Sequence, residues 1–261
     1  MVNKLTVLML GDVSGTAGMG ALFLGLSSFV KEIKADFVVC NGENAAGGFG
    51  IAPEDFYKMK ECGCSVITSG NHIWQKDAIY PLLDSEDTLL RPANYPTHEV
   101  PGHGYVICNV GKYQIGVVNL QGRNFMPQID CPFKVGLSTV EKIRKQTPLI
   151  LVDFHAEDTS EKEALAYYLD GKVSAVVGTH THVQTSDATI LPLKTGYITD
   201  LGLTGVQRQV IGSDASISIQ RQITQLPIKS VVAQGVGVLQ GIILTLDADR
   251  GDCLSIVPFS R

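Results

Sequence analysis

Five apolar runs of this 261-residue chain each end in side chains that can bind a metal. The endings are Gly11-Asp12 after VLML, Gly42-Glu43-Asn44 after FVVC, Gly70-Asn71-His72 after VIT, His155 after LILVDF, and Gly178-Thr179-His180-Thr181-His182 after AVV. Strands that pack side by side would bring these carboxylate, amide and imidazole groups to a common edge. Such an edge predicts a site for two divalent cations, and two-metal sites mostly hydrolyse phosphate esters.

His180 and His182 are the first candidates for metal ligands. In extended backbone, residues two apart point to the same side at roughly 6 to 7 Å, so this pair can reach two cations about 3.5 to 4 Å apart. His155 repeats the arrangement at the end of another apolar run. The alternative for each is a buried, hydrogen-bonded core histidine, but a pair directly after a hydrophobic strand favours ligation.

Asp12 and Glu43 supply the charged oxygen atoms that hard or borderline cations prefer. A carboxylate between two cations offsets their mutual repulsion, and Glu43 is predicted to be that bridge. A helix N-cap at Asp12 and a turn residue at Glu43 are the structural alternatives. Asn44 and Asn71 add neutral oxygen ligands.

His72 is predicted to have a different role. It is adjacent to Asn71, so if Asn71 points toward the cations, His72 points elsewhere, toward the substrate. An imidazole near its unperturbed pKa can protonate a leaving oxygen or stabilise charge on phosphorus. We therefore predict that His72 is the catalytic residue.

The elements around these residues alternate between strands and helices, which is typical of an α/β protein. Helical spacing of apolar residues predicts a helix within 20–34, followed by a strand over 37–40, and Pro53 starts a second helix that leads to a strand over 65–68. Two antiparallel hairpins are predicted, one joining 105–110 to 114–120 and one joining 236–246 to 253–259. Capping boxes at Ser138 with Glu141 and at Ser160 with Glu163 predict two further helix starts.

The chain is expected to form one domain over residues 1–261, because no linker rich in Pro, Gly or Ser divides it. The stretch 199–230 is polar, has no clear periodicity and contains three glycines. We predict a loop over the active site there, and a disordered excursion is the alternative.

Composition narrows the classes of partner and the location. The net charge of −5 has no basic block to set against it, so tight binding of long nucleic acid is not expected, and a nucleotide substrate would be small. No apolar segment approaches the roughly 20 residues that cross a bilayer. The opening run at 5–10 leads straight to Gly11-Asp12 without a cleavage pattern, so we expect a cytoplasmic protein. Cys62 and Cys64 are interpreted as free thiols, with metal chelation as the alternative.

The motifs Gly11-Asp12, Gly70-Asn71-His72 and Gly178-Thr179-His180-Thr181-His182 resemble, in order and in context, those of calcineurin-like metallophosphoesterases. That superfamily usually has Asp-x-His first and Gly-Asp-x-x-Asp second, whereas this chain has Asp12-Val13-Ser14 and Gly42-Glu43-Asn44. In these two motifs the chain resembles the YmdB-type branch of the superfamily. The members of that branch are bacterial phosphodiesterases noted for activity on 2′,3′-cyclic nucleotides. Segments 41–48, 119–123, 152–157 and 199–205 also fit that branch.

The resemblance implies a four-layer αββα sandwich of two mixed β-sheets flanked by helices. It implies two divalent or trivalent metal ions, one held by Asp12, Glu43, Asn44 and His182 and the other by Glu43, Asn71, His155 and His180. His72 would be the catalytic histidine. Because the ligands are nitrogen and oxygen without cysteine, Fe or Mn is expected, with Zn or Co as alternatives. The family also suggests a homo-oligomer.

The predicted function is therefore that of a dinuclear-metal phosphodiesterase acting on small phosphodiesters, with 2′,3′-cyclic nucleotides as the leading candidates. One alternative is a regulatory metal-binding protein of the same fold that acts through partners. Another is a phosphomonoesterase with the same machinery. Two interpretations also remain for Arg123, as a phosphate clamp or as a surface residue.

Overall fold

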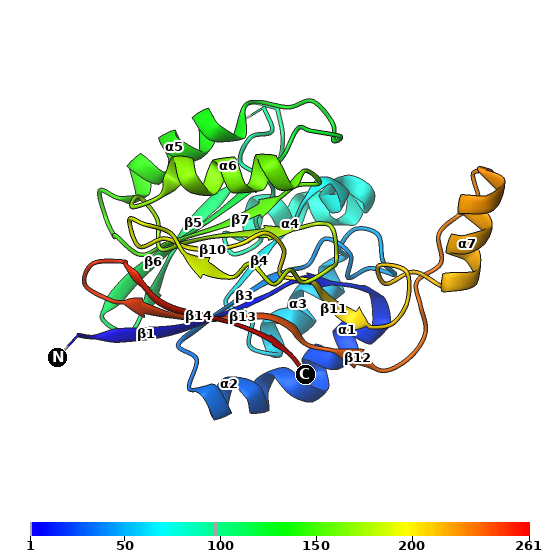
Figure 1. Cartoon of the computed structure of the whole chain (residues 1–261), viewed down its shortest axis with the longest axis horizontal. Helices are drawn as coiled ribbons and strands as arrows, with labels where there is room; N and C mark the ends of the chain where they lie inside the picture. The colour runs from blue at the N-terminus through cyan, green and yellow to red at the C-terminus, as the bar shows by residue number, and fades with distance from the viewer. Residues whose placement is uncertain (1, 97–98) are drawn as a thin grey trace.

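The computed structural model describes residues 2–96 and 99–261 of the chain. Two mixed β-sheets lie face to face in the middle of the molecule, with α5 and α6 on one outer face and α1, α2 and α3 on the other (Figure 1). This arrangement confirms the predicted four-layer αββα sandwich.

The first sheet has five strands. In spatial order they are β14 (Cys253–Ser260), β13 (Gln240–Asp247), β1 (Lys4–Leu10), β3 (Phe37–Asn41) and β4 (Val66–Thr68). β1, β3 and β4 are parallel to one another, whereas β13 is antiparallel to both of its neighbours. The carboxyl ends of β1, β3 and β4 therefore lie at one edge of the sheet.

The second sheet has six strands and the same mixture of directions. Its spatial order is β5 (Tyr105–Val110), β6 (Tyr113–Gln121), β7 (Ile150–His155), β8 (Ala175–Thr179), β10 (Gly196–Ile198) and β9 (Thr189–Ile190). β6, β7, β8 and β10 are parallel, and the two outermost strands are antiparallel to them. Its parallel strands also end together at one edge.

A small third sheet joins β12 (Gly237–Val238), β11 (Leu203–Val206) and β2 (Asp12–Val13). β11 and α7 (Ala215–Thr224) both lie within 199–230, so this segment is not the continuous loop that the sequence predicted. β11 pairs with β2, whereas α7 projects from the body at the right of Figure 1. The pairing between distant segments could not be read from local periodicity.

The remaining helices connect and cover the sheets. They are α1 (Gly15–Ala21), a π-helical turn (Leu22–Leu26), α2 (Ser27–Ile33), α3 (Pro53–Glu61), two 3-10 helices (Asn71–Gln75 and Asp77–Ile79), α4 (Tyr80–Ser85), α5 (Pro132–Ile143) and α6 (Thr159–Leu169). The expected helix near 20–34 thus starts five residues earlier, at Gly15. The helix predicted at Pro53 is confirmed.

Alternation along the strands builds the core on both faces of each sheet. Val7 of β1 and Leu151 of β7 lie in the cluster between the two sheets. Leu8 packs on the opposite face with the helices α1 to α4, and Val152 packs with α5 and α6. Because both faces are covered, the strands are apolar almost without interruption.

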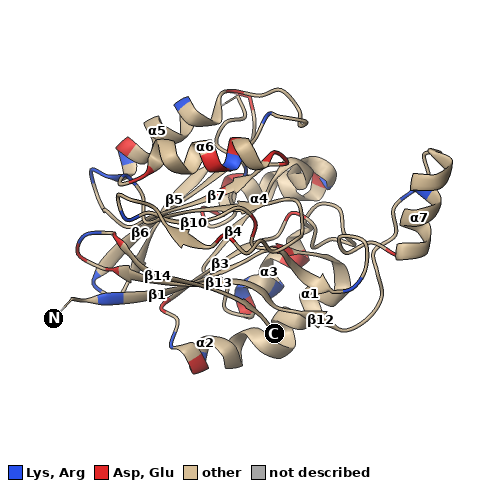
Figure 2. Cartoon of the chain, viewed as in Figure 1, with Lys and Arg blue, Asp and Glu red and all other residues tan. Residues whose placement is uncertain are grey.

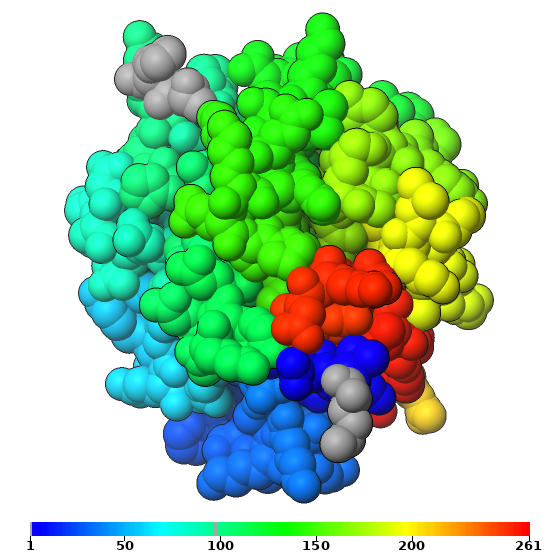
Figure 3. Space-filling model, turned by 90° about the vertical axis from the view of Figure 1, so that its left-hand side faces the viewer, coloured from blue at the N-terminus to red at the C-terminus, as the bar shows by residue number. Residues whose placement is uncertain are grey.

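Both predicted hairpins are confirmed, since β5 pairs with β6 and β13 pairs with β14 in antiparallel register. Figure 3 shows the start of the chain packed against the red hairpin of β13 and β14. The two predicted capping boxes are wrong. Ser138 lies inside α5, which starts at Pro132, and the N-cap of α6 is Asp158, whose side chain accepts a hydrogen bond from Glu161 N. A capping motif alone does not distinguish a helix start from an interior turn.

Lys and Arg are scattered over separate elements and mixed with Asp and Glu in the part of the chain that is described (Figure 2). Across residues 2–96 and 99–261, no helix has the length and hydropathy needed to span a membrane.

Candidate metal centre

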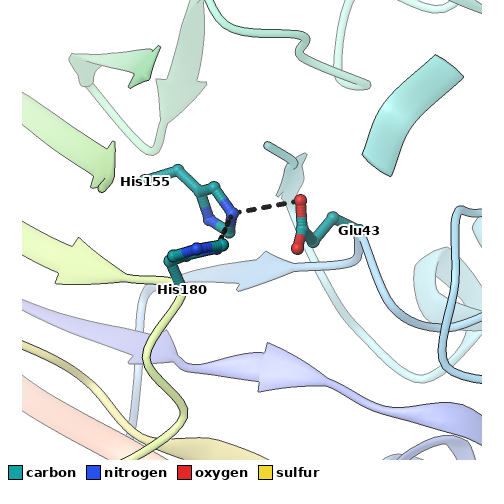
Figure 4. Close-up of side chains that lie close together, drawn as sticks. All are labelled: Glu43, His155 and His180. Atoms are coloured by element: carbon teal, nitrogen blue, oxygen red, sulfur yellow. Dashed lines mark hydrogen bonds and ion pairs between the residues drawn. The ribbon is translucent and has the colours of Figure 1, made fainter. Parts of the chain in front are cut away.

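The predicted ligands all lie at the carboxyl ends of parallel strands or just beyond them. Asp12 opens β2 directly after β1, Glu43 and Asn44 follow β3, and Asn71 starts the 3-10 helix after β4. His155 ends β7, and His180 and His182 follow β8. The two sheets bring their strand ends together, so that Glu43, His155 and His180 converge although they come from different strands (Figure 4).

Glu43, His155 and His180 form one compact group, in which one ligand atom of each lies within 4.8 Å of the others. His155 Nε2 is 3.1 Å from Glu43 Oε2 and 2.9 Å from His180 Nδ1. Glu43 and His155 are fully buried and His180 is half-buried. A carboxylate oxygen and two ring nitrogens that face one point could hold a transition-metal cation.

Asp12, Asn44 and His182 form a second group on the other side of Glu43. His182 Nε2 lies 3.6 Å from Asp12 Oδ1 and 3.1 Å from Asn44 Nδ2. Asn44 Nδ2 also donates to Glu43 Oε1 at 3.1 Å, which places the Glu43 carboxylate beside both groups. The structure therefore brings Asp12, Asn44 and His182 together beside the Glu43 carboxylate.

Two buried oxygen atoms in this region lack a hydrogen-bond donor among the described residues. They are Asp12 Oδ1 and Asn71 Oδ1. A buried acceptor without a partner is costly, and such atoms in native proteins usually meet an ion or a water. These two oxygens and the nitrogen and oxygen donors around them fit a pair of cations.

His155 and His180 each have their second ring nitrogen held by the protein. His155 Nδ1 lies 2.9 Å from Thr179 Oγ1, and Thr179 donates to Asp153 Oδ1 at 2.7 Å. His180 Nε2 lies 3.1 Å from Glu157 Oε2. Fixing one ring nitrogen orients the other toward a metal and sets the tautomer. Thr179 and Glu157 were not singled out from the sequence, although both are adjacent or nearly adjacent to a candidate ligand.

The contact of Asp153 with His155 is indirect. The Thr179 hydroxyl lies between the Asp153 carboxylate and the His155 ring. Asp153 Oδ2 also accepts hydrogen bonds from Thr68 Oγ1 and Asn41 Nδ2. This buried polar network joins the ends of β3, β4, β7 and β8.

The extended backbone expected at His180 and His182 is wrong. Strand β8 stops at Thr179, and the two histidines have φ values of 101° and 63°. Long-range hydrogen bonds hold this turn, because His180 N donates to Asp12 Oδ2 and Thr181 N donates to Asp200 Oδ2, each at 3.1 Å. The histidines still face the two groups of oxygen donors, but turn geometry directs them there.

Close approach of the two sheets requires glycine at position 70. A Cβ atom there would lie 2.1 Å from His155 Cδ2 and 2.4 Å from Glu43 Oε2. No side chain fits in that space, so Gly70 permits the ends of β4 and β7 to meet at the centre.

His72 is half-buried beside the centre. Its Nδ1 lies 2.8 Å from Asn44 Oδ1 and 3.2 Å from Glu43 Oε1, and its backbone N–H donates to Glu43 Oε2 at 3.2 Å. The imidazole packs against the ring of Phe49 with centroids 4.0 Å apart. His72 is thus held at the edge of the candidate ligands, where it can exchange a proton with a bound group.

The electrostatics favour ionised carboxylates and a neutral His180. Burial by itself raises the pKa of Glu43, but His155 and His72 outweigh it and hold that pKa well below its usual range. Burial likewise opposes ionisation of Asp12, and His182 with His155 lowers its pKa nonetheless. Burial, reinforced by His155, lowers the pKa of His180 to about 3. Asp12 overcomes the effect of burial on His182 and raises its pKa to about 9.

Comparison with known proteins gives relatives along most of the chain. A relative from Bacillus subtilis (strain 168), named 2′,3′-cyclic-nucleotide 2′-phosphodiesterase, is 42% identical over 241 residues, covering 92% of this chain and 91% of the relative. A crystal structure of a novel phosphatase from Mycoplasma pneumoniae has a TM-score of 0.93 at 32% identity and covers 100% of this chain and 94% of that one. A hypothetical protein from Thermus thermophilus has a TM-score of 0.90 at 38% identity, with 98% of this chain and 99% of that chain covered.

The four-layer fold and these relatives define the class of the protein, which is that of the metallophosphoesterases, hydrolases of phosphoric esters. The family model described as YmdB-like protein matches residues 8–259. The chain therefore belongs to the YmdB-like family, as the motifs at its strand ends predicted.

Proposed function

We propose that this protein is a phosphodiesterase that uses two metal ions to hydrolyse 2′,3′-cyclic nucleotides. The observation that carries the proposal is the position of the Glu43 carboxylate, with His155 and His180 on one side and Asn44 and His182 on the other. A carboxylate so placed can bridge two cations, which is the arrangement of two-metal phosphoesterases. The name of the Bacillus subtilis relative supports the substrate class.

In this proposal, Asp12, Glu43, Asn44 and His182 would hold one cation, and Glu43, Asn71, His155 and His180 would hold the other. The unpaired Asp12 Oδ1 and Asn71 Oδ1 support this division, because each belongs to a different set. Iron or manganese suits the mixture of nitrogen and oxygen donors.

The bound cations would polarise the phosphoryl oxygens and activate the attacking water. His72 then has the task of protonating the leaving ribose oxygen. When the imidazole is protonated, Asn44 Oδ1 and Glu43 Oε1 accept from its Nδ1, which leaves Nε2–H free for the leaving group. Packing against Phe49 holds the ring in that orientation.

In the view of Figure 2, Lys and Arg lie on separate elements and are interspersed with Asp and Glu, which supports a small substrate. The relative's printed activity concerns the 2′ bond. We therefore expect hydrolysis of 2′,3′-cyclic AMP to yield the nucleoside 3′-monophosphate.

The test is turnover of 2′,3′-cyclic AMP by protein stripped of metal and then reconstituted separately with manganese and with iron. Metal-dependent release of a single isomer, adenosine 3′-monophosphate, is the expected result. Absence of turnover when metal analysis shows both sites filled would contradict the proposal and favour a regulatory role. Turnover of adenosine 3′-monophosphate itself would instead indicate a phosphomonoesterase.

A further inference from the structure

Buried polar atoms without a partner are concentrated around the metal centre. Within the part of the chain that the structure describes, they are Asp12 Oδ1, Asn71 Oδ1, Trp74 Nε1, Gln121 Nε2 and Arg123 Nε. The first two are acceptors and belong to the candidate ligands. The other three are N–H donors, and no proposed ligand role accounts for them. Because buried donors are nearly always hydrogen-bonded, three of them in one region indicate an acceptor that the protein alone does not supply.

Gln121 lies directly beside a candidate ligand. It is the last residue of β6 and is the register partner of His155 at the end of β7. Residues paired in neighbouring strands point to the same face of a sheet, so Gln121 shares the face of His155. Its Oε1 already accepts a hydrogen bond from Tyr95 OH at 3.0 Å, which leaves the amide N–H groups as the unpaired end.

Trp74 reaches the same place from the other sheet. It belongs to the 3-10 helix Asn71–Gln75, which also carries His72. Its ring lies edge-on to Tyr95 with centroids 5.2 Å apart, and Tyr95 in turn contacts Gln121. Trp74, Tyr95 and Gln121 thus form a continuous cluster beside the centre.

Arg123 adds a positive charge two residues beyond Gln121. Its backbone N–H donates to the Glu161 carboxylate at 3.0 and 3.1 Å, which anchors the main chain, while the side-chain Nε is buried and unpaired. Arg123 lies near the start of the segment 122–131, which forms neither helix nor strand. This segment can adjust around a ligand without breaking a sheet ladder.

We propose that Trp74, Gln121 and Arg123 form a donor wall that binds the phosphoryl oxygens of the substrate. This inference rests on the proposed function, because it assigns the unpaired donors to the anion that the cations attract. Unpaired acceptors and unpaired donors at one sheet edge suit a ligand that is bound by cations on one side and by N–H groups on the other. A phosphodiester has that property, since its two non-bridging oxygens share a negative charge.

The variants that test the wall remove donors while keeping size. In Gln121→Met and Arg123→Met the side chains remain long but cannot donate, and Trp74→Phe keeps an aromatic ring without the N–H. Gln114→Met on the same strand and Arg144→Met at the C-cap of α5 are matched controls, because the side chains of both residues bond to groups far from the centre. Metal content and thermal melting are measured for every variant, so that loss of cations or of the fold is detected.

The first readout is calorimetric binding of inorganic phosphate to the metal-loaded protein. Each wall variant loses a hydrogen bond to a charged group, so its dissociation constant for phosphate should rise by about tenfold. The dissociation constants of the controls should change by less than about twofold. Gln121→Glu, which replaces the amide by a carboxylate, should weaken binding further. Unchanged phosphate binding in all wall variants with both cations present would overturn the proposal.

The second readout separates this inference from the proposed function. Hydrolysis of 2′,3′-cyclic AMP by the wall variants should show a raised KM, and hydrolysis by the wild type tests the substrate class. If the wild type does not hydrolyse the cyclic nucleotide while the variants still bind phosphate more weakly, the result supports the donor wall and contradicts the proposed substrate. If the wild type hydrolyses it and the variants retain both KM and phosphate affinity, the donor wall falls alone.

Discussion

The two sheets contribute different halves of the candidate metal centre. The strands β1, β3 and β4 lead to the candidate oxygen ligands Asp12, Glu43, Asn44 and Asn71, whereas β7 and β8 lead to the three histidines. Each of these histidines has its second ring nitrogen held by the protein. The partners are Thr179 for His155 at 2.9 Å, Glu157 for His180 at 3.1 Å, and the carbonyl of Ile211 for His182 at 2.8 Å.

The oxygen half is less complete. Asp12 Oδ1 and Asn71 Oδ1 have no donor among the described residues. The protein itself therefore orients the histidines, whereas Asp12 Oδ1 and Asn71 Oδ1 are left for a partner that the described residues do not supply. The predictions below test this difference.

The largest effect is expected for His180→Ala. This change removes a nitrogen from the group formed with Glu43 and His155, so one of the two cations should be lost. Turnover should fall by about 10³-fold or more, because a catalytic cation supplies several kcal/mol of transition-state stabilisation. Metal analysis and steady-state kinetics check both. An unchanged metal content would refute ligation by His180.

His72→Ala should separate chemistry from metal binding. Loss of a general acid lowers turnover by about 10²- to 10⁴-fold, while both cations should stay bound. His103→Ala is a matched control, because His103 is exposed and pairs with Asp87 at 3.6 Å. Parallel loss of metal and activity in His72→Ala would identify His72 as a metal ligand and would contradict its proposed role as the general acid.

Thr179→Val tests how far hydrogen bonds within the protein orient the histidines before a cation binds. The change keeps the shape of the side chain and removes the hydroxyl between His155 Nδ1 and Asp153 Oδ1. Metal affinity should fall by about 10- to 100-fold, as is typical when such a supporting hydrogen bond is lost. Competition with a chelator measures the affinity, and Thr189→Val on the edge strand β9 serves as the control. Equal affinities in the two variants would show that the hydroxyl does not orient His155.

Amide hydrogen exchange should show the smallest and most local effect. Removing the cations should raise exchange in peptides covering 42–50 and 70–76, which carry the oxygen ligands, more than in a peptide covering 150–158. The reason is that segments outside the sheets open more readily than a central strand. A uniform change in all three peptides would contradict the difference between histidines that the protein orients and oxygen residues that depend on the cations.

Part of the fold was predictable because it depends on local signals. Alternating apolar runs and turn residues were sufficient for the two hairpins and for the helix at Pro53. The capping boxes at Ser138 and Ser160 failed because the same residue types also occur inside a helix or within its first turn. β11 and α7 were missed because the pairing of β11 with β2 joins segments about 190 residues apart in sequence.

For the centre, the sequence by itself determined which chemical groups are available and that they follow strands. Asp, Glu, Asn and His at the ends of apolar runs were sufficient to predict a two-cation site and the family. Parallel strands place their carboxyl ends at one edge, so strand-end residues converge whatever the connecting loops do.

Only the tertiary structure decided how the groups are aimed and what supports them. The left-handed backbone of His180 and His182 depends on hydrogen bonds from this turn to Asp12 and Asp200. Both aspartates lie outside the motif 178–182. The Thr179 hydroxyl beside His155 and the unpaired donors of Trp74, Gln121 and Arg123 likewise arise only where the two sheets meet. Side-chain direction after a strand follows the dihedral angles of the turn, and contacts between distant segments fix those angles.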